Sequence, residues 1–160
     1  MVQKIMKSAN LFLLFEPREK YWPLDSQHIA LMEFLGKPIV RHIVDDLSLV
    51  LRIKKMIAIS SDKSLIAKLE EVINAPVEIH FEQIDNDNIE DIANTIDSYC
   101  TDSGFLLSKA SNISLSLYTS RLKTNEKVII EDNFLYISER EYKSTPREKI
   151  IKKIKQITNA

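Results

Sequence analysis

The sequence predicts a three-layer α/β domain with a mostly parallel, Rossmann-like sheet, a C-terminal antiparallel hairpin and a final helix. Two observations lead to this prediction. Short apolar runs of strand length alternate along the chain with longer segments whose apolar residues recur at helical spacing. Near the C-terminus, two β-rich runs flank Glu131-Asp132-Asn133, which is turn chemistry. Because 160 residues suit one core, we expect a single domain over residues 1–160.

The first strand and the first helix lie on either side of a long loop. Residues 10–15 form a nearly continuous apolar run, which is typical of a strand buried on both faces. The loop after it contains one helical turn at most, around residues 29–34, and Gly36-Lys37-Pro38 then starts a helix. Its broad apolar face consists of Ile39, Val40, Ile43, Val44, Leu47, Val50 and Leu51. We expect this helix to be largely covered.

The next elements continue the alternation. Residues 55–60 predict a second strand, and Ser61 or Asp62 is placed to cap a helix whose apolar residues are periodic as far as Ile73. Residues 77–81 alternate apolar and polar side chains, which indicates a half-exposed strand at or near the sheet edge.

A further helix and strand follow in the middle of the chain. Asn88 is placed to cap a helix that keeps its period through Tyr99, and Gly104 precedes the short apolar strand Phe105-Leu106-Leu107. Residues 113–122 fit both an alternating and a helical pattern, and we favour a helix.

The C-terminal part combines the hairpin with the final helix. Residues 127–130 and 134–138 are the predicted hairpin strands. Thr145-Pro146-Arg147-Glu148 places a capping residue, a first-turn proline and a reciprocal glutamate in order, so the last helix is expected to begin there. Its apolar stripe consists of Ile150, Ile151, Ile154 and Ile157.

Composition excludes several classes of function. A formal net charge of -1 excludes a globally basic nucleic-acid binder, and two glycines cannot form a glycine-rich phosphate loop. One cysteine excludes an internal disulfide, and the three histidines lack zinc-ligand spacing. No apolar run reaches the ~18 residues of a membrane helix, and no small-residue cleavage site follows the N-terminal stretch, so we expect a cytoplasmic protein without membrane contact.

The order of elements and several motifs resemble the sugar-phosphate nucleotidyltransferases. Residues 31–47, with Gly-Lys-Pro at the start of a helix, are similar to a stretch of that family, and Pro23-Leu24-Asp25 lies where the family has Pro-Leu-Thr. Three further segments resemble its second strand, its strand before the metal site and its later hairpin, namely residues 56–60, 104–110 and 128–138. The resemblance spans residues 8–140 and implies the fold of that family.

The residues that would carry the family's chemistry differ. The glycine positions of its phosphate loop fall on Phe15, Glu16 and Arg18, and its arginine falls on Lys20. Its Lys-Pro pair falls on Ile29-Ala30. Its Gly-Asp, whose carboxylate holds magnesium, falls on Lys109-Ala110. The resemblance therefore implies a degenerate, truncated domain, and we expect no catalytic residue, no metal site and no cofactor.

Four residues remain as candidate ligand contacts. Lys20 and Trp22 fit an aromatic and cationic clamp, or a loop that packs on its own tryptophan. Lys37 is the cation of Gly-Lys-Pro. Lys109 ends a strand where open α/β sheets bind ligands, although a structural salt bridge explains it equally well. His42 and Cys100 are expected to be packed residues.

Charge is distributed unevenly along the chain. Between Leu69 and Gly104 there are ten acidic and no basic residues, whereas Arg140 to Lys155 holds seven basic and two acidic residues. A solvated face is the alternative explanation for either segment. Together they favour salt-sensitive association with a protein partner or a second copy. Nucleic acid is a further candidate partner, through Arg147, Lys149, Lys152, Lys153 and Lys155.

The function predicted from these features is a non-catalytic, nucleotidyltransferase-like interaction or regulatory subunit, since the scaffold is consistent while the catalytic loop is not. The alternative is an enzyme or sensor with a reorganised site that binds a nucleotide or sugar phosphate. The third hypothesis is a nucleic-acid-associated factor that uses the basic C-terminal helix.

Overall fold

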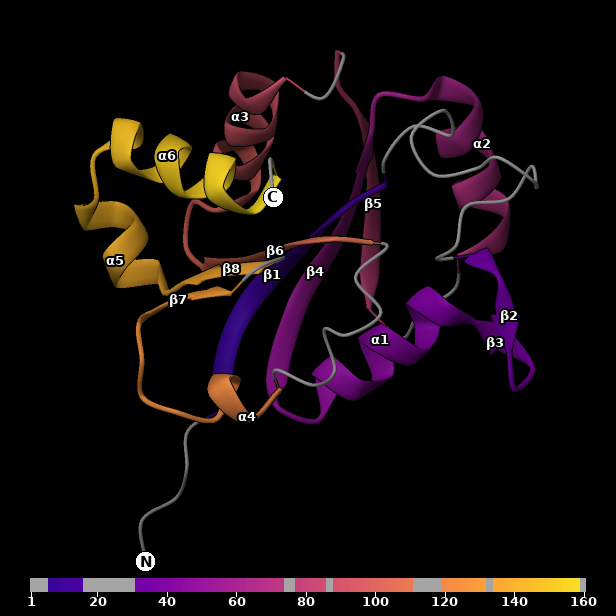
Figure 1. Ribbon diagram of the computed structural model, residues 1–160, viewed down its shortest axis with the longest axis horizontal. Coiled ribbons are helices and arrows are strands. Elements are labelled where there is room, and N and C mark those ends of the chain that lie inside the picture. Colours follow the sequence, from indigo (N-terminus) through magenta and orange to yellow (C-terminus); the bar gives the residue numbers. More distant parts are fainter. Residues whose placement is uncertain are drawn as a thin grey trace, which may run out of the picture.

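A six-stranded sheet forms the middle layer of the protein, with its strands in the order β5-β4-β1-β6-β8-β7 (Figure 1). The computed structural model describes residues 6–15, 31–73, 77–85, 88–110, 119–131 and 134–158. The strands are β1 (Lys7–Leu14), β4 (Leu51–Ser60), β5 (Glu78–Gln83), β6 (Gly104–Lys109), β7 (Val128–Glu131) and β8 (Phe134–Ile137). β5, β4, β1 and β6 run parallel, and β8 pairs antiparallel with both β6 and β7. The predicted sheet, its edge strand β5 and its C-terminal hairpin are confirmed.

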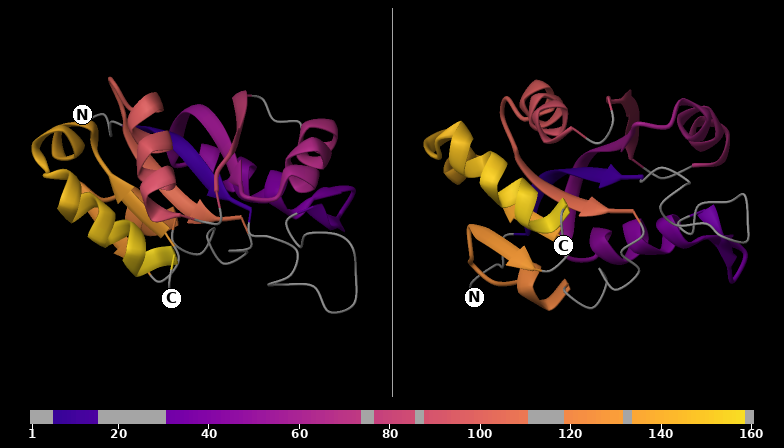
Figure 2. Two further views of the ribbon diagram at one scale, coloured as in Figure 1. Left: turned by 90° about the horizontal axis from the view of Figure 1, so that it is seen from above. Right: turned by 45° about the horizontal axis from the view of Figure 1, so that its top comes forward.

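Helices cover both faces of this sheet (Figure 2). One face carries α1 (Ile39–Ser48) and α2 (Lys63–Val72), and the other carries α3 (Ile89–Tyr99) and α6 (Arg147–Thr158). The remaining elements are α4 (Thr119–Leu122), α5 (Glu139–Ser144) and a small hairpin of β2 (Glu33–Phe34) and β3 (Lys37–Pro38). The three-layer architecture is therefore the predicted one. Within the described ranges, no helix is long and apolar enough to cross a membrane.

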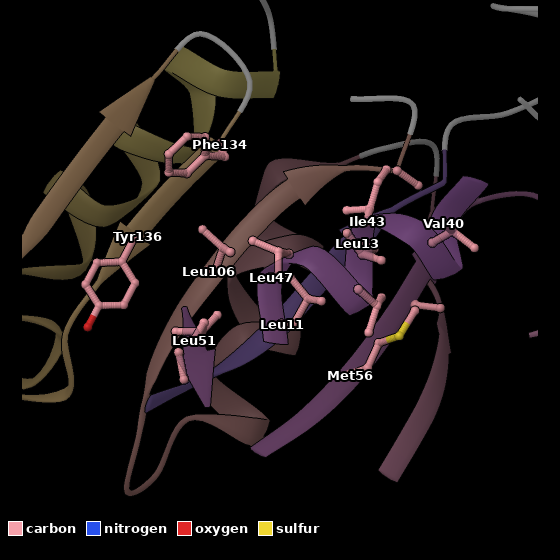
Figure 3. Packing of buried hydrophobic residues seen from close by; sticks show 14 of the residues in the cluster. Leu11, Leu13, Val40, Ile43, Leu47, Leu51, Met56, Leu106, Phe134 and Tyr136 are labelled. Atoms are coloured by element: carbon pink, nitrogen blue, oxygen red, sulfur yellow. The ribbon is translucent and has the colours of Figure 1, made fainter. Parts of the chain in front are cut away.

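The core consists of two layers that share β1. Leu11 and Leu13 face α1, where they join a cluster that includes Leu47 (Figure 3). Phe12 and Leu14 point to the opposite side and pack with α3 and α6. Successive side chains of a strand alternate between its faces, so a continuous apolar run is what a strand between two helical layers requires.

Two of the predicted helix caps are present. The Asp62 carboxylate accepts a hydrogen bond from the Leu65 N–H (3.2 Å), and the Asn88 side chain accepts one from the Glu90 N–H (2.9 Å). Each bond satisfies one of the N–H groups that a helix start leaves without a partner. The starts of α2 and α3 are therefore fixed locally by the sequence.

Two boundaries differ from the prediction, and a third prediction is tested only in part. α1 ends at Ser48, and Leu51 is the first residue of β4. The pattern extended the predicted helix too far because Leu51, a buried residue of the strand, continues the apolar spacing of the helix. Of the predicted helical turn around residues 29–34, positions 29 and 30 lie outside the described residues, while Glu33–Phe34 is strand β2. Residues 111–118 also lie outside them, so only α4 represents the helix favoured for residues 113–122.

The predicted capping box at Thr145 is wrong. The unpredicted helix α5 ends there, with Thr145 as its C-cap residue and the Thr145 hydroxyl donating to the Glu141 carbonyl (2.5 Å). α6 begins one residue later, after Pro146, whose carbonyl accepts hydrogen bonds from the Lys149 and Ile150 N–H groups. Thr145 is therefore the C-cap of α5, although the sequence pattern predicted it as the N-cap of α6.

Candidate functional site

The carboxyl ends of β5, β4, β1 and β6 lie at one edge of the sheet. After β1 the chain places β4 and β5 on one side of it and β6 on the other. Ligands of open α/β sheets bind where the strand order reverses in this way, at the carboxyl ends of the strands. The candidate site is therefore the edge between the ends of β1 and β6, which we call the switch point.

The described floor of the switch point is apolar, and its backbone is internally paired. The Ala110 N–H donates to the Leu14 carbonyl (2.8 Å), and the Phe15 N–H donates to the Ile59 carbonyl (2.8 Å). Phe15 and Ala110 are both buried, at 1% and 0% exposure. These two N–H groups bond to neighbouring strands, so neither is directed at a ligand.

Lys109 and Ala110 occupy the position where the family resemblance implies a magnesium-binding carboxylate. Lys109 is the last residue of β6, half-buried and paired in register with Leu14. Magnesium requires oxygen ligands, whereas this position offers an ammonium group and a buried methyl group. The residues present do not fit the metal. Over the described ranges there is also no group of three His, Cys, Asp or Glu side chains that could hold a metal ion.

Of the other predicted ligand residues, the structure describes Lys37. Lys37 is on β3, where its Nζ is 2.5 Å from Asp45 Oδ2, and Arg41 Nε lies 3.0 Å from the other carboxylate oxygen. The hydrogen bond from Lys37 is the main cause that lowers the pKa of Asp45. This ion-pair group joins the small hairpin to the start of α1, and the hairpin forms a sheet of its own (Figure 1). Lys20 and Trp22 lie outside the described residues.

The small hairpin of β2 and β3 exposes a cluster of large apolar side chains that sequence reasoning missed. Met32, Phe34 and Leu35 are all exposed, Leu35 to 82%. Leu35 has a φ of 53° and Gly36 a φ of 84°, so a tight turn holds Leu35 in a left-handed conformation. His42 fixes the hairpin on α1, since its Nε2 is 2.5 Å from the Phe34 carbonyl oxygen and its ring packs edge-on against Phe34. His42 is thus a packed residue, as predicted.

Charged residues of opposite sign gather in different parts of the fold. The acidic segment forms the end of α2, β5 and α3, and the basic segment forms α5 and most of α6. Arg147 connects the two segments: it forms an ion pair with Asp97, lies 3.7 Å from Glu90 and donates a hydrogen bond to the Asn94 side chain. Arg147, one of the five predicted nucleic-acid contacts, therefore has partners within its own chain.

A cavity of about 190 Å³ lies where α3, α5 and α6 meet. Its lining consists of Ala93, Asp97, Tyr142, Thr145, Arg147 and Ile150. The Tyr142 hydroxyl donates to Asp97, which also pairs with Arg147. The polar groups of this cavity bind one another, so it is part of the docking of the C-terminal helices.

Cys100 is buried at the C-terminal end of α3, as predicted. Burial raises the pKa of its thiol to about 11. The unfolded chain should therefore ionise near the ordinary value of 9.0 and the folded chain only later, so stability is lost as the pH rises through this interval. We expect the difference in unfolding free energy between wild type and Cys100→Ala, measured in urea, to fall between pH 9 and 11. Parallel pH profiles for the two proteins would contradict this, as would rapid thiol labelling of the native protein at neutral pH.

The comparisons with known proteins concern the fold. A cytidylyltransferase from Leptospira borgpetersenii serovar Hardjo-bovis superposes with a TM-score of 0.56 at 11% sequence identity, over 97% of this chain and 69% of that chain. UDP-glucose pyrophosphorylase from Acinetobacter baumanii gives a TM-score of 0.51 at 10% identity, over 98% and 84%. No protein-family model matches the sequence, and neither does any curated protein. The chain therefore has the nucleotidyltransferase fold.

Proposed function

We propose that the protein is a non-catalytic relative of the nucleotidyltransferases that acts in the cytoplasm as an interaction or regulatory subunit. The observation that carries the proposal is the chemistry of the switch point, where Lys109 and the buried Ala110 stand in the place of the implied magnesium ligand. The structural neighbours support the fold. The proposed loss of catalysis rests on the residues of this chain.

The switch point lacks the electrostatic groups that nucleotidyl transfer needs, among the residues that the structure describes. Transfer of a nucleotidyl group requires that the charge developing on the phosphates be stabilised, in most phosphoryl-transfer sites by a metal ion between carboxylates and phosphate oxygens. Ala110 presents a methyl group there, and its N–H is bonded to Leu14. Among the described residues of the switch point, Lys109 supplies a positive charge but no oxygen ligand for a metal.

The surface supports a role in protein binding. Contiguous exposed apolar side chains mark protein–protein contacts more often than chance exposure does, and Met32, Phe34 and Leu35 form such a group on one fixed hairpin. The left-handed backbone at Leu35 is a local cost that a glycine or asparagine would reduce. A function of the leucine side chain in binding accounts for its presence at this position.

The test is calorimetric titration with the four nucleoside triphosphates in the presence of magnesium, followed by a pyrophosphate-release assay with sugar 1-phosphates. We expect neither binding heat nor turnover, with an active nucleotidyltransferase as the positive control. Turnover above the background of heat-denatured protein would overturn the proposal.

The alternative of a nucleotide or sugar-phosphate sensor rests on one observation, the half-buried cation at the switch point. Binding without turnover would favour it. In that case Lys109→Ala should abolish the binding heat, whereas Lys152→Ala, at an exposed lysine of α6, is the matched control and should leave it unchanged.

A further inference from the structure

The fold places the β5 part of the acidic segment and the basic helix α6 at opposite edges of the sheet. β5 is one edge strand, and α2 packs beside it. The acidic edge is defined as Glu70 and Glu71 on α2 together with Glu78, Glu82 and Asp85 on and after β5, where Glu82 lies on the face that contacts α3. At the other edge, α6 packs over the hairpin of β7 and β8. The views in Figures 1 and 2 agree that α6 and α2 are at opposite ends of the molecule.

The lysines of α6 face away from the sheet. Ile150, Ile154 and Ile157 are buried on one side of the helix. The lysine face is defined as Lys149, Lys152, Lys153 and Lys155; Lys149, Lys152 and Lys155 are exposed, and Lys153 is half-buried beside the isoleucine stripe. No ion pair connects any of these four lysines with another described residue, in contrast to Arg147, which pairs with α3. The lysine face is therefore a concentrated positive surface without an internal counterpart among the described residues.

The acidic edge is also poorly compensated within the chain. Lys55 lies 3.9 Å from Glu78, whose side chain remains 61% exposed, and Glu82 accepts a hydrogen bond from the Tyr99 hydroxyl. Glu70, Glu71 and Asp85 form no ion pair inside the described ranges. Charges on an edge strand oppose the addition of another strand, so contacts at this edge involve side chains.

We infer that the lysine face of one copy binds the acidic edge of a second copy. This inference rests on the proposed function, because it names the partner of an interaction subunit. The two surfaces are complementary in charge and are present on every molecule. Since they lie at opposite ends of the sheet, the contact is heterologous, and a bound pair leaves one lysine face and one acidic edge open.

A second copy fits better than nucleic acid. Four lysines are a small electrostatic footprint for nucleic acid. A second copy offers five carboxylates of its own to these four lysines. The contact consists of exposed charges, so it is expected to be weak and sensitive to salt.

The test is sedimentation velocity of the full chain at about 20 mM and about 500 mM salt, where screening lengths differ several-fold. We expect a weight-average mass that rises with protein concentration beyond the monomer at low salt, and a monomer at high salt. Two charge-reversal variants test the surfaces: K149E/K152E/K155E and E70K/E71K/E78K. Each variant alone should be monomeric at low salt, whereas their equimolar mixture should associate again, because reversal on both sides restores complementarity. Unchanged circular dichroism and melting temperature establish that both variants fold.

The outcomes separate this inference from the proposed function. A wild-type monomer at low salt, or a mixture that stays monomeric, overturns self-association and leaves the non-catalytic role standing. Pyrophosphate release overturns the non-catalytic role whatever the mass. Binding of a fluorescent oligonucleotide that is lost in the lysine-reversal variant, without mass recovery on mixing, would assign the lysine face to nucleic acid and overturn the inference.

Discussion

Gly104→Ala should lower the free energy of unfolding by about 3 kcal/mol, since overpacking a site without room forces the backbone to move. A Cβ at this position would lie 2.4 Å from the Ile137 carbonyl oxygen, 2.8 Å from the Glu139 nitrogen and 2.9 Å from the Ser138 carbonyl carbon. All three are backbone atoms at the junction of β8 and α5, so no side-chain rotation relieves the contact. Urea unfolding measures the loss, and the melting temperature should fall by on the order of 10 °C.

Gly36→Ala is the matched control, because the added Cβ there strains the backbone conformation but overlaps with no neighbouring atom. A Cβ at Gly36 meets nothing within 4 Å, but its φ of 84° disfavours any residue with a Cβ. We expect a loss of about 1 kcal/mol, and a smaller one for Gly36→Asn, which tolerates this region better. Equal losses of unfolding free energy for Gly104→Ala and Gly36→Ala would contradict the close approach of β6 to the junction of β8 and α5.

The sheet was predictable from the sequence because its strands are buried in ways that leave simple patterns. The apolar run over residues 10–15 and the alternation over 77–81 correspond to a strand between two helical layers and to an edge strand. Asn10 interrupts the first pattern without disturbing the fold. It is buried, and its side-chain nitrogen donates to the Tyr99 carbonyl (3.0 Å) and the Ser103 hydroxyl (2.9 Å), so its polarity is satisfied by partners that no local pattern reveals.

The boundaries that were missed depend on tertiary contacts. Thr145 looks like the start of a helix because threonine, proline and glutamate occur in the right order, yet α5 uses it as a C-cap. Glu33–Phe34 forms a strand because it pairs with Lys37–Pro38 and because His42 holds the Phe34 carbonyl. Neither pairing partner can be identified from helical or strand periodicity.

The candidate site was predictable only in part. The resemblance placed Lys109-Ala110 at the end of the fourth parallel strand, and β6 ends at Lys109. It did not indicate that Lys37 pairs with Asp45 or that Leu35 is exposed, since both depend on how the small hairpin folds over α1. Charge segregation was visible as composition, but its meaning required the strand order, which puts β5 and β7 at opposite edges.

The opposite edges and the switch point together suggest how the fold serves the proposed role. In this sheet the centre, between β1 and β6, is packed and internally bonded, whereas unpaired charge lies at the edges. A packed sheet centre is common to enzymes and binding proteins of this architecture, because ligands bind at the carboxyl ends of the strands and not within the sheet. The charged edges are the part of this fold that the proposed interaction role would use.

Ala110→Asp provides the sharpest test of the switch point. If the position is a packed core site, a carboxylate there is buried without a ligand, and we expect a loss of about 3–5 kcal/mol of unfolding free energy, the cost of an uncompensated buried charge. Burial would raise the folded-state pKa of the new carboxyl group above its unfolded value, so the loss is present above about pH 4 and shrinks as the pH falls toward that value. Urea unfolding of variant and wild type at matched pH values measures the difference.

Ala110→Ser is the control for size, since it adds one small polar atom without charge, and it should cost less than Ala110→Asp at neutral pH. Magnesium decides between the two interpretations of the position. If Ala110 merely replaces a ligand in an otherwise intact metal site, the aspartate variant should keep its stability and gain melting temperature with millimolar magnesium. The internal bond from the Ala110 N–H to Leu14 and the complete burial of the methyl group predict the opposite, a destabilised variant whose melting temperature is the same with and without the metal.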